Sequence, residues 1–150
     1  MGSAERVPIE VQRLDPELPL PRPAHADDAG YDLYARIDVI LPPGGGRALV
    51  PTGLAVAIPP GYAGFVLPRS GLALRHGVTC LNAPGLIDPR YRGELQCLLV
   101  NTDAAEAFTV HRGDRVAQLV VQRVVQIDWQ PVDALDPTTR HADGFGSTGR

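Results

Sequence analysis

The chain has 150 residues, with 14 basic and 17 acidic side chains and a formal net charge of −3. This balance argues against a protein that binds nucleic acid mainly through charge. All the basic residues are arginine. The absence of lysine excludes a Schiff-base lysine and a Walker-type phosphate loop. Arginines, hydroxyls and backbone N–H groups would therefore have to bind any phosphate.

Proline and glycine are frequent, with 15 and 16 residues. Because both interrupt helices, this composition favours a turn-rich, all-β fold, and the length predicts one domain. Short apolar runs predict strands at residues 9–14, 39–41, 48–50, 54–58, 62–67, 108–111 and 115–127. Strands this short and closely spaced indicate a sandwich or a barrel.

Two more apolar runs, residues 78–81 and 95–100, predict a hairpin around the segment 82–94. Within this segment Asp88 precedes a proline, which favours extended backbone at the aspartate, and Tyr91 follows closely. A solvated turn uses the same residue types. The segment alone therefore leaves a plain turn and a functional loop equally open.

The segment Pro68–Ala73 also has two interpretations. Ser70 fits the N-cap of a short helix over residues 71–75 that ends at Gly77. The free N–H groups of such a helix, with Arg69 and the Ser70 hydroxyl, would also suit an anion. In isolation, the capped helix is the commoner interpretation.

The remaining features predict the cellular location of the protein and argue against certain metal sites. Cys80 and Cys97 lie in apolar runs without paired spacing, which predicts buried free thiols. The four histidines are scattered, so we expect no dedicated zinc site. No apolar run approaches 18 residues, and the first residues lack a signal-peptide core. We therefore expect a cytoplasmic protein with no membrane or nucleic-acid partner.

Five segments occur in a recognisable order: Asp28–Ala35, Pro68–Ala73, Asn82–Glu94, Arg112–Leu119 and Gly144–Gly149. In that order and spacing, the sequence resembles the trimeric deoxyuridine triphosphatases (dUTPases) from about Asp28 to Gly149. The resemblance implies an all-β, jelly-roll-like β-barrel at residues 1–136 and a flexible C-terminal lid at residues 137–150. It also implies a homotrimer whose active sites are shared between subunits.

The implied activity is that of a dUTP diphosphatase, which uses Mg²⁺ to hydrolyse dUTP to dUMP and pyrophosphate through attack of water at the α-phosphorus. Such an enzyme keeps uracil out of DNA and supplies dUMP for thymidylate synthesis. By the resemblance, Asp88 is the catalytic carboxylate that holds the sugar and orients the water. Asn82 and the hairpin backbone around Leu86 bind uracil, and Tyr91 packs against the deoxyribose.

The phosphate site follows from the same resemblance. Arg69, Ser70 and Gly71 match the segment that wraps the bridging phosphates, and Gln118 matches a contact to the α-phosphate. Asp32 matches a carboxylate that reaches Mg²⁺ through water, while the triphosphate supplies most of the metal's ligands. Arg112 and Asp114 are expected to be structural, as a charge pair near the site.

The tail completes the set and also departs from the family pattern. Arg140 matches a phosphate arginine, Phe145 matches a ring that stacks on uracil, and Gly146, Ser147 and Thr148 match groups at the outer phosphates. The family has glycine after the arginine and two glycines before the ring, whereas this chain has His141-Ala142-Asp143-Gly144. We expect a stiffer lid with weaker or more pH-sensitive closure.

Three alternatives remain open at this point. A related dCTP deaminase would place a catalytic glutamate where this chain has Cys97-Leu98-Leu99. A catalytically silent member would bind nucleotide, or a protein partner, without turnover. A structural trimeric β-module would leave the polar residues of the five segments unexplained.

Overall fold

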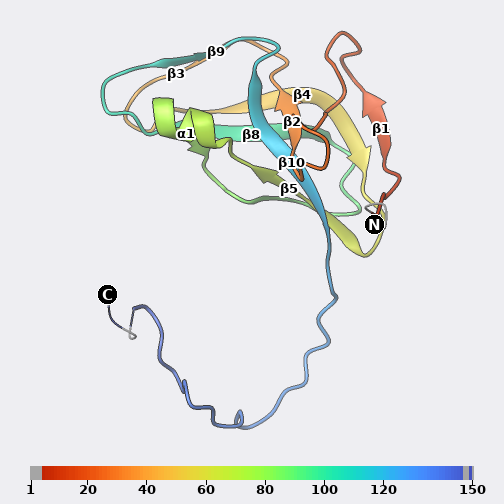
Figure 1. Ribbon diagram of the computed structural model, residues 1–150, viewed down its shortest axis with the longest axis vertical. Coiled ribbons are helices and arrows are strands. Elements are labelled where there is room, and N and C mark those ends of the chain that lie inside the picture. The colour runs from red at the N-terminus through yellow and green to blue at the C-terminus, as the bar shows by residue number, and fades with distance from the viewer. Residues whose placement is uncertain (1–4, 147–148, 150) are drawn as a thin grey trace.

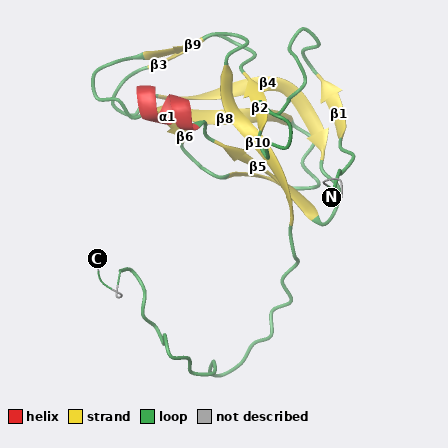
Figure 2. Ribbon diagram, in the orientation of Figure 1, coloured by secondary structure: helices red, strands yellow, loops and turns green. Residues whose placement is uncertain are grey.

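The computed structural model describes residues 5–146 and residue 149. Two four-stranded antiparallel sheets form most of the body, with a two-stranded ribbon and one short helix (Figure 2). One sheet has the order β1 (Glu10–Arg13), β4 (Arg47–Ala57), β8 (Glu94–Asn101), β6 (Val78–Cys80). The other has the order β2 (Tyr31–Tyr34), β10 (Arg115–Arg123), β5 (Tyr62–Leu67), β7 (Gly85–Ile87). The ribbon pairs β3 (Val39–Leu41) with β9 (Phe108–Val110), and α1 (Ser70–His76) joins β5 to β6. The predicted all-β class is confirmed.

The hydrophobic core combines side chains from both sheets. Leu33 of β2 and Ala117 of β10 are fully buried in one cluster with Val50 of β4 and with Leu95 and Leu99 of β8. The alternation of buried and less buried residues along β8 follows the period of two that a strand imposes. Within the described residues, no helix is long and apolar enough to cross a membrane.

The two cysteines belong to this core, as predicted. Cys80 and Cys97 are free and buried. Burial raises the pKa of the Cys80 thiol to about 11. Burial, with the neighbouring Cys80, raises the pKa of the Cys97 thiol to about 12. Both thiols are therefore neutral and poorly reactive at physiological pH.

The prediction of two strands at residues 48–50 and 54–58 is wrong, because β4 runs without interruption through Pro51-Thr52-Gly53. The chain accommodates these residues as an irregularity, with a shift in the β4–β8 register between Pro51 and Ala55. Gly53 has a φ of 74°, and its N–H donates to the Glu94 carboxylate at 2.8 Å. A side chain thus replaces the ladder bond that the bulge removes.

The last strand is shorter than predicted, because it ends at Arg123 rather than at residue 127. Its partner β5 begins at Tyr62, which pairs with Arg123, and beyond that pair the Val124 N–H donates to the Gly61 carbonyl at 2.9 Å. After this bond, residues 125–146 leave the body as an extended tail (Figure 1). The apolar side chains beyond the strand, such as Val125 and Ile127, are consequently exposed.

The predicted hairpin forms, since β6 pairs with β8 in antiparallel register from Val78↔Asn101 to Cys80↔Leu99. Its connection is more than a turn. The connection contains β7, which crosses to the other sheet and pairs with β5 from Gly85↔Val66 to Ile87↔Gly64. An added Cβ on Gly85 would lie 3.3 Å from Val66 Cβ, so this close pairing favours glycine. The segment 82–94 is therefore tied to both sheets.

Candidate active site

Asp32 lies in β2 and is buried, with 9% of its surface exposed. Its Oδ1 is 3.5 Å from Nε of Arg69, and its Oδ2 is 3.5 Å from Nη1 of Arg115. Arg69 follows β5 and Arg115 begins β10, and these strands are neighbours in one sheet with β2. The sheet therefore brings three charges, distant in sequence, to one point.

Gln118 lies directly opposite Asp32 in the β10–β2 ladder. It is half-buried, and its Nε2 donates to the carbonyl of Pro68 at 3.0 Å. A Cβ added to Gly30 would lie only 2.1 Å from Gln118 Oε1. Glycine at position 30 is therefore required for this placement of the glutamine side chain.

These residues surround a cleft of about 400 Å³. We call it the Asp32 cleft, and its lining is Ala24, Asp28, Ala29, Gly30, Asp32, Arg69, Ser70, Gly71 and Gln118. The structure thus places Asp32 and the four residues predicted for the bridging and α-phosphates around one cavity. Their individual roles stay predictions.

Ser70 differs from its expected place in the helix. It is the first residue of α1, and Arg69 occupies the N-cap position without a side-chain capping bond. The prediction of Ser70 as the cap is therefore wrong. At the other end, Gly77 adopts the left-handed conformation with a φ of 63°, as the sequence predicted. The exposed Ser70 hydroxyl lies on the cleft lining rather than closing a cap.

The other predicted residues of the core domain lie elsewhere in the chain. Asp88 lines a broad second cleft of about 1300 Å³, together with Pro89, Arg90 and Arg92 and with residues 8–10 and 57–61. None of the described residues that line this cleft also lines the Asp32 cleft. Asn82, Leu86 and Tyr91 are exposed on the same connection. One chain therefore does not bring Asp88 together with the predicted phosphate residues.

Side-chain hydrogen bonds fix the backbone of the connection, residues 82–94, whereas the side chain predicted for catalysis is exposed. Arg92 Nη1 donates to the carbonyls of Pro89 at 2.6 Å and of Tyr91 at 3.0 Å. The Tyr91 hydroxyl donates to the Glu94 carbonyl at 2.9 Å. A Cβ on Gly93 would lie 2.5 Å from that hydroxyl, so the ring needs glycine there. By contrast, the exposed Asp88 carboxylate has no hydrogen-bond or ion-pair partner among the described residues.

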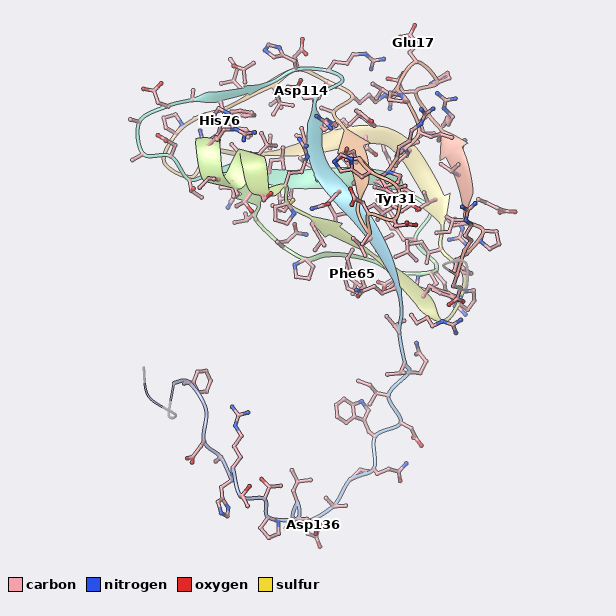
Figure 3. All side chains as sticks on the ribbon, in the orientation of Figure 1. Glu17, Tyr31, Phe65, His76, Asp114 and Asp136 are labelled. Carbon is pink, nitrogen blue, oxygen red and sulfur yellow. The ribbon has the colours of Figure 1, made fainter. Side chains whose placement is uncertain are left out.

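The tail that carries the predicted lid residues runs away from the body in this conformation (Figure 3). Phe145 is fully exposed, and among the described residues Arg140 Nε donates to the Asp143 carbonyl alone, at 3.1 Å. His141 has a φ of 48°, in the left-handed region that glycine adopts most readily, and it occupies the position that is glycine in the family pattern. The predictions for Ser147 and Thr148 lie outside the described residues.

The expected Arg112–Asp114 charge pair is wrong. Arg112 instead pairs with Asp15 and reaches Glu17 at 3.3 Å, while Asp114 accepts from the N–H of His111. Arg36 extends this network, lying 3.4 Å from Asp15 and 3.2 Å from Glu94. The Arg112 hydrogen bond, despite partial desolvation, lowers the pKa of the Asp15 carboxyl to about 2. Sequence spacing could not reveal the network, because its members come from separate turns.

The donor set limits how a metal could bind. Among the described residues, no group of three or more histidine, cysteine, aspartate or glutamate side chains is arranged to hold an ion. The Asp32 cleft does contain two carboxylates, those of Asp28 and Asp32. Such a set fits a cation whose ligands come mainly from phosphate oxygens and water, and does not fit a tightly held structural ion.

Comparisons with known proteins agree on one family. A family model described as dUTPase matches residues 16–149. The chain belongs to the dUTPase family. Among its dUTPase relatives, the deoxyuridine 5'-triphosphate nucleotidohydrolase of Thermobifida fusca is 57% identical over 95% of this chain and 79% of that protein.

Solved dUTPases share the fold. The enzyme of Staphylococcus bacteriophage 80alpha, solved with dUPNHPP, is 26% identical, with a TM-score of 0.85 over 95% of this chain and 99% of that one. A mutant dUTPase of phage phi11, described with a structural Mg(II) ion, is 25% identical, with a TM-score of 0.77 over 87% and 100%. These likenesses confirm the predicted dUTPase-type fold.

Proposed function

We propose that the chain hydrolyses dUTP to dUMP and pyrophosphate. The observation that carries this proposal is the match to the dUTPase family over residues 16–149, which spans both the Asp32 cleft and the Asp88 connection. The biological role would be to keep uracil out of DNA in the cytoplasm and to supply dUMP for thymidylate synthesis.

In this proposal Asp88 accepts a proton from the water that attacks the α-phosphorus. A carboxylate suits this role because general-base catalysis contributes about 10²–10⁴-fold when the group is correctly placed. The exposure of Asp88 and its lack of a partner among the described residues support this assignment. Asn82 and the backbone around Leu86 would bind uracil, and Tyr91 would pack against the deoxyribose.

The triphosphate would lie in the Asp32 cleft. Arg69 would contact the bridging phosphates with Ser70 and Gly71, and Gln118 would contact the α-phosphate. Mg²⁺, when bound, would offset the negative charge of the triphosphate, and Asp32 would hold it through water. The remaining catalysis would be positioning and electrostatic stabilisation by the residues of the chain.

Because Asp88 and the Asp32 cleft are separate in one chain, we propose that the active site is assembled in a homotrimer. The connection of one subunit would face the cleft of another. The exposed apolar residues that follow β10 support such an assembly: Ile127 is 67% exposed and Trp129 is 80% exposed. Such an exposed apolar stretch is typical of surfaces that a partner covers.

We further propose that residues 137–150 close over a site of a neighbouring subunit as a lid, while residues 1–136 form the β domain. Arg140 would then contact phosphate, and Phe145 would stack on uracil. Gly146, Ser147 and Thr148 would contact the outer phosphates.

The test is release of pyrophosphate from dUTP with Mg²⁺, alongside release of ammonia from dCTP. We expect the first and not the second, since Cys97 and Leu99 are buried and the segment 97–99 contains no carboxylate. Nucleotide binding without turnover would instead favour a silent binder. Truncation before Arg140 should reduce turnover strongly while leaving the body folded, and full activity of that truncation would contradict the lid.

A further inference from the structure

Arg115 reaches Asp32, one of the residues that line the Asp32 cleft, because of an irregularity in β10. In the β10–β2 ladder, Gln118 pairs with Asp32 and Ala117 with Leu33, but Arg115, not Val116, pairs with Tyr34. One extra residue is therefore inserted between positions 115 and 117, as in a β-bulge. Since opposite residues share a face, the bulge places Arg115 on the face of Asp32 and Gln118.

The bulge also explains the burial pattern. Val116 is 2% exposed and Ala117 is fully buried, so both side chains fill the core. In a regular strand, Arg115 and Gln118 would point to opposite faces, because their positions are three apart. Two successive buried residues are thus accommodated while both polar side chains stay on the cleft face.

Arg115 is held loosely there. Its Nη1 lies 3.5 Å from Asp32 Oδ2, longer than a strong charged hydrogen bond of about 2.8 Å. Its side chain is 49% exposed, and in the described part of the chain its guanidinium has Asp32 as its only partner. Its backbone carbonyl accepts from Arg69 Nη1 at 3.0 Å, which links the two arginines. Most N–H donors of Arg115 are therefore available to a ligand.

The charge balance of the cleft makes this arginine important. The lining contains two carboxylates, Asp28 and Asp32, but one arginine, Arg69. These residues give the lining a net negative charge, which disfavours a polyphosphate. Arg115, beside the lining at Asp32, brings the local sum to zero, and its planar fork can bind two phosphate oxygens at once.

We propose that Arg115 is a further substrate-binding residue, which exchanges its loose contact with Asp32 for the phosphate chain of the nucleotide. The inference rests on the proposed function for the identity of the nucleotide. It predicts that the contribution of Arg115 grows with the number of phosphates. A purely structural Arg115 would affect all nucleotides equally.

The test compares Arg115→Gln, which removes the charge, with Arg115→Lys, which keeps the charge but loses the fork. The matched control is Arg123→Gln, an arginine at the far end of the same strand that pairs with Glu5. The readouts are the Kd values of dUMP and dUDP by calorimetry, the KM and kcat for dUTP, and the melting temperature of each variant.

We expect Arg115→Gln to weaken dUDP and to raise the KM for dUTP by about tenfold to a hundredfold, as expected for loss of a charged hydrogen bond. The Kd of dUMP should change less than about threefold. Arg115→Lys should give an intermediate value, and Arg123→Gln should match the unmodified chain. If Arg115→Gln does not fold, Arg115→Lys decides the outcome. An Arg115→Lys variant that binds dUDP with an unchanged Kd overturns the inference.

Equal weakening of dUMP and dUDP by Arg115→Gln, or no weakening, also overturns the inference. The proposed function is contradicted by a different result, in which the unmodified chain binds dUDP but does not turn over dUTP. In that case the ratio of the two Kd values still decides the role of Arg115. An unmodified chain that binds neither nucleotide contradicts both proposals.

Discussion

The Asp32 cleft and the connection from Asn82 to Glu94 differ in how completely one chain builds them. In the cleft, Asp32 has two arginine partners and Gln118 has a carbonyl partner. On the connection, Asp88 is exposed, and its carboxylate has no partner among the described residues. The cleft is organised by its own sheet, whereas the connection presents its groups to something outside the chain. We therefore expect a substitution at Asp88 to reduce activity without reducing stability, and a substitution in the cleft to reduce both.

The largest expected effect is at Asp88. Asp88→Asn should lower kcat for dUTP by about 10²–10⁴-fold, because the amide cannot act as a general base. The melting temperature should stay unchanged, since the native carboxylate is exposed and unpaired among the described residues. Steady-state pyrophosphate release and thermal denaturation check the two expectations. Asp133→Asn, in the exposed tail, is the control, and retained activity of Asp88→Asn would refute the base assignment.

Phe145→Ala tests whether function can also be lost without stability in the tail, as expected for the connection. Loss of stacking on a base, about 1–3 kcal/mol, should lower kcat/KM roughly 5- to 150-fold through a higher KM and a lower kcat. The ring is fully exposed in the free chain, so the melting temperature should not change. Unchanged kinetics would remove the lid from the proposal.

Gly30→Ala should show the opposite behaviour, with stability and function lost together. The added Cβ would lie 2.1 Å from Gln118 Oε1, so this flexible side chain must move and give up its bond to the Pro68 carbonyl, at a cost of about 0.5–1.5 kcal/mol of unfolding free energy. Urea denaturation measures the loss. Adding Gln118→Ala removes the overlap, so the double variant should recover most of the cost of Gly30→Ala. Additive losses would show that the glutamine is not the obstacle.

The smallest effect concerns the Asp15–Arg112–Arg36 network. The pKa of Asp15 is lowered from 3.8 to about 2 in the folded chain, so this group stabilises the fold fully above its unfolded pKa. That contribution is lost as the pH falls from about 4 to about 2. Asp15→Asn should be less stable at pH 7 and should lose less stability on acidification. Urea midpoints at pH 7, 4 and 3 measure this, and parallel curves for both chains would contradict it.

Several features were predictable because they depend on local sequence. The short apolar runs located β3 and β5 at their observed bounds, since Pro42 follows β3 and Gly61 and Pro68 flank β5. The positive φ of Gly77 follows from its place after the last helical residue. The burial of Cys80 and Cys97 follows from their apolar neighbours.

Other features are decided by distant contacts and have no local signal. Pro51-Thr52-Gly53 reads as a break, but pairing with β8 and the bond from Gly53 to Glu94 keep β4 continuous. The apolar run at 115–127 reads as one strand, but β5 is too short to pair with all of it. Arg112 pairs with Asp15 because the fold brings two turns together.

The sequence by itself determined the all-β class and the dUTPase family, and it predicted the candidate site residues, since these reside in breakers, short runs and five ordered motifs. Only the tertiary structure separated the Asp88 connection from the Asp32 cleft and brought Arg115 to the cleft face. Both depend on ladder register, and a shift of one residue reverses which side chains face a cleft. Register is set by pairing between distant strands, which composition and local spacing do not record.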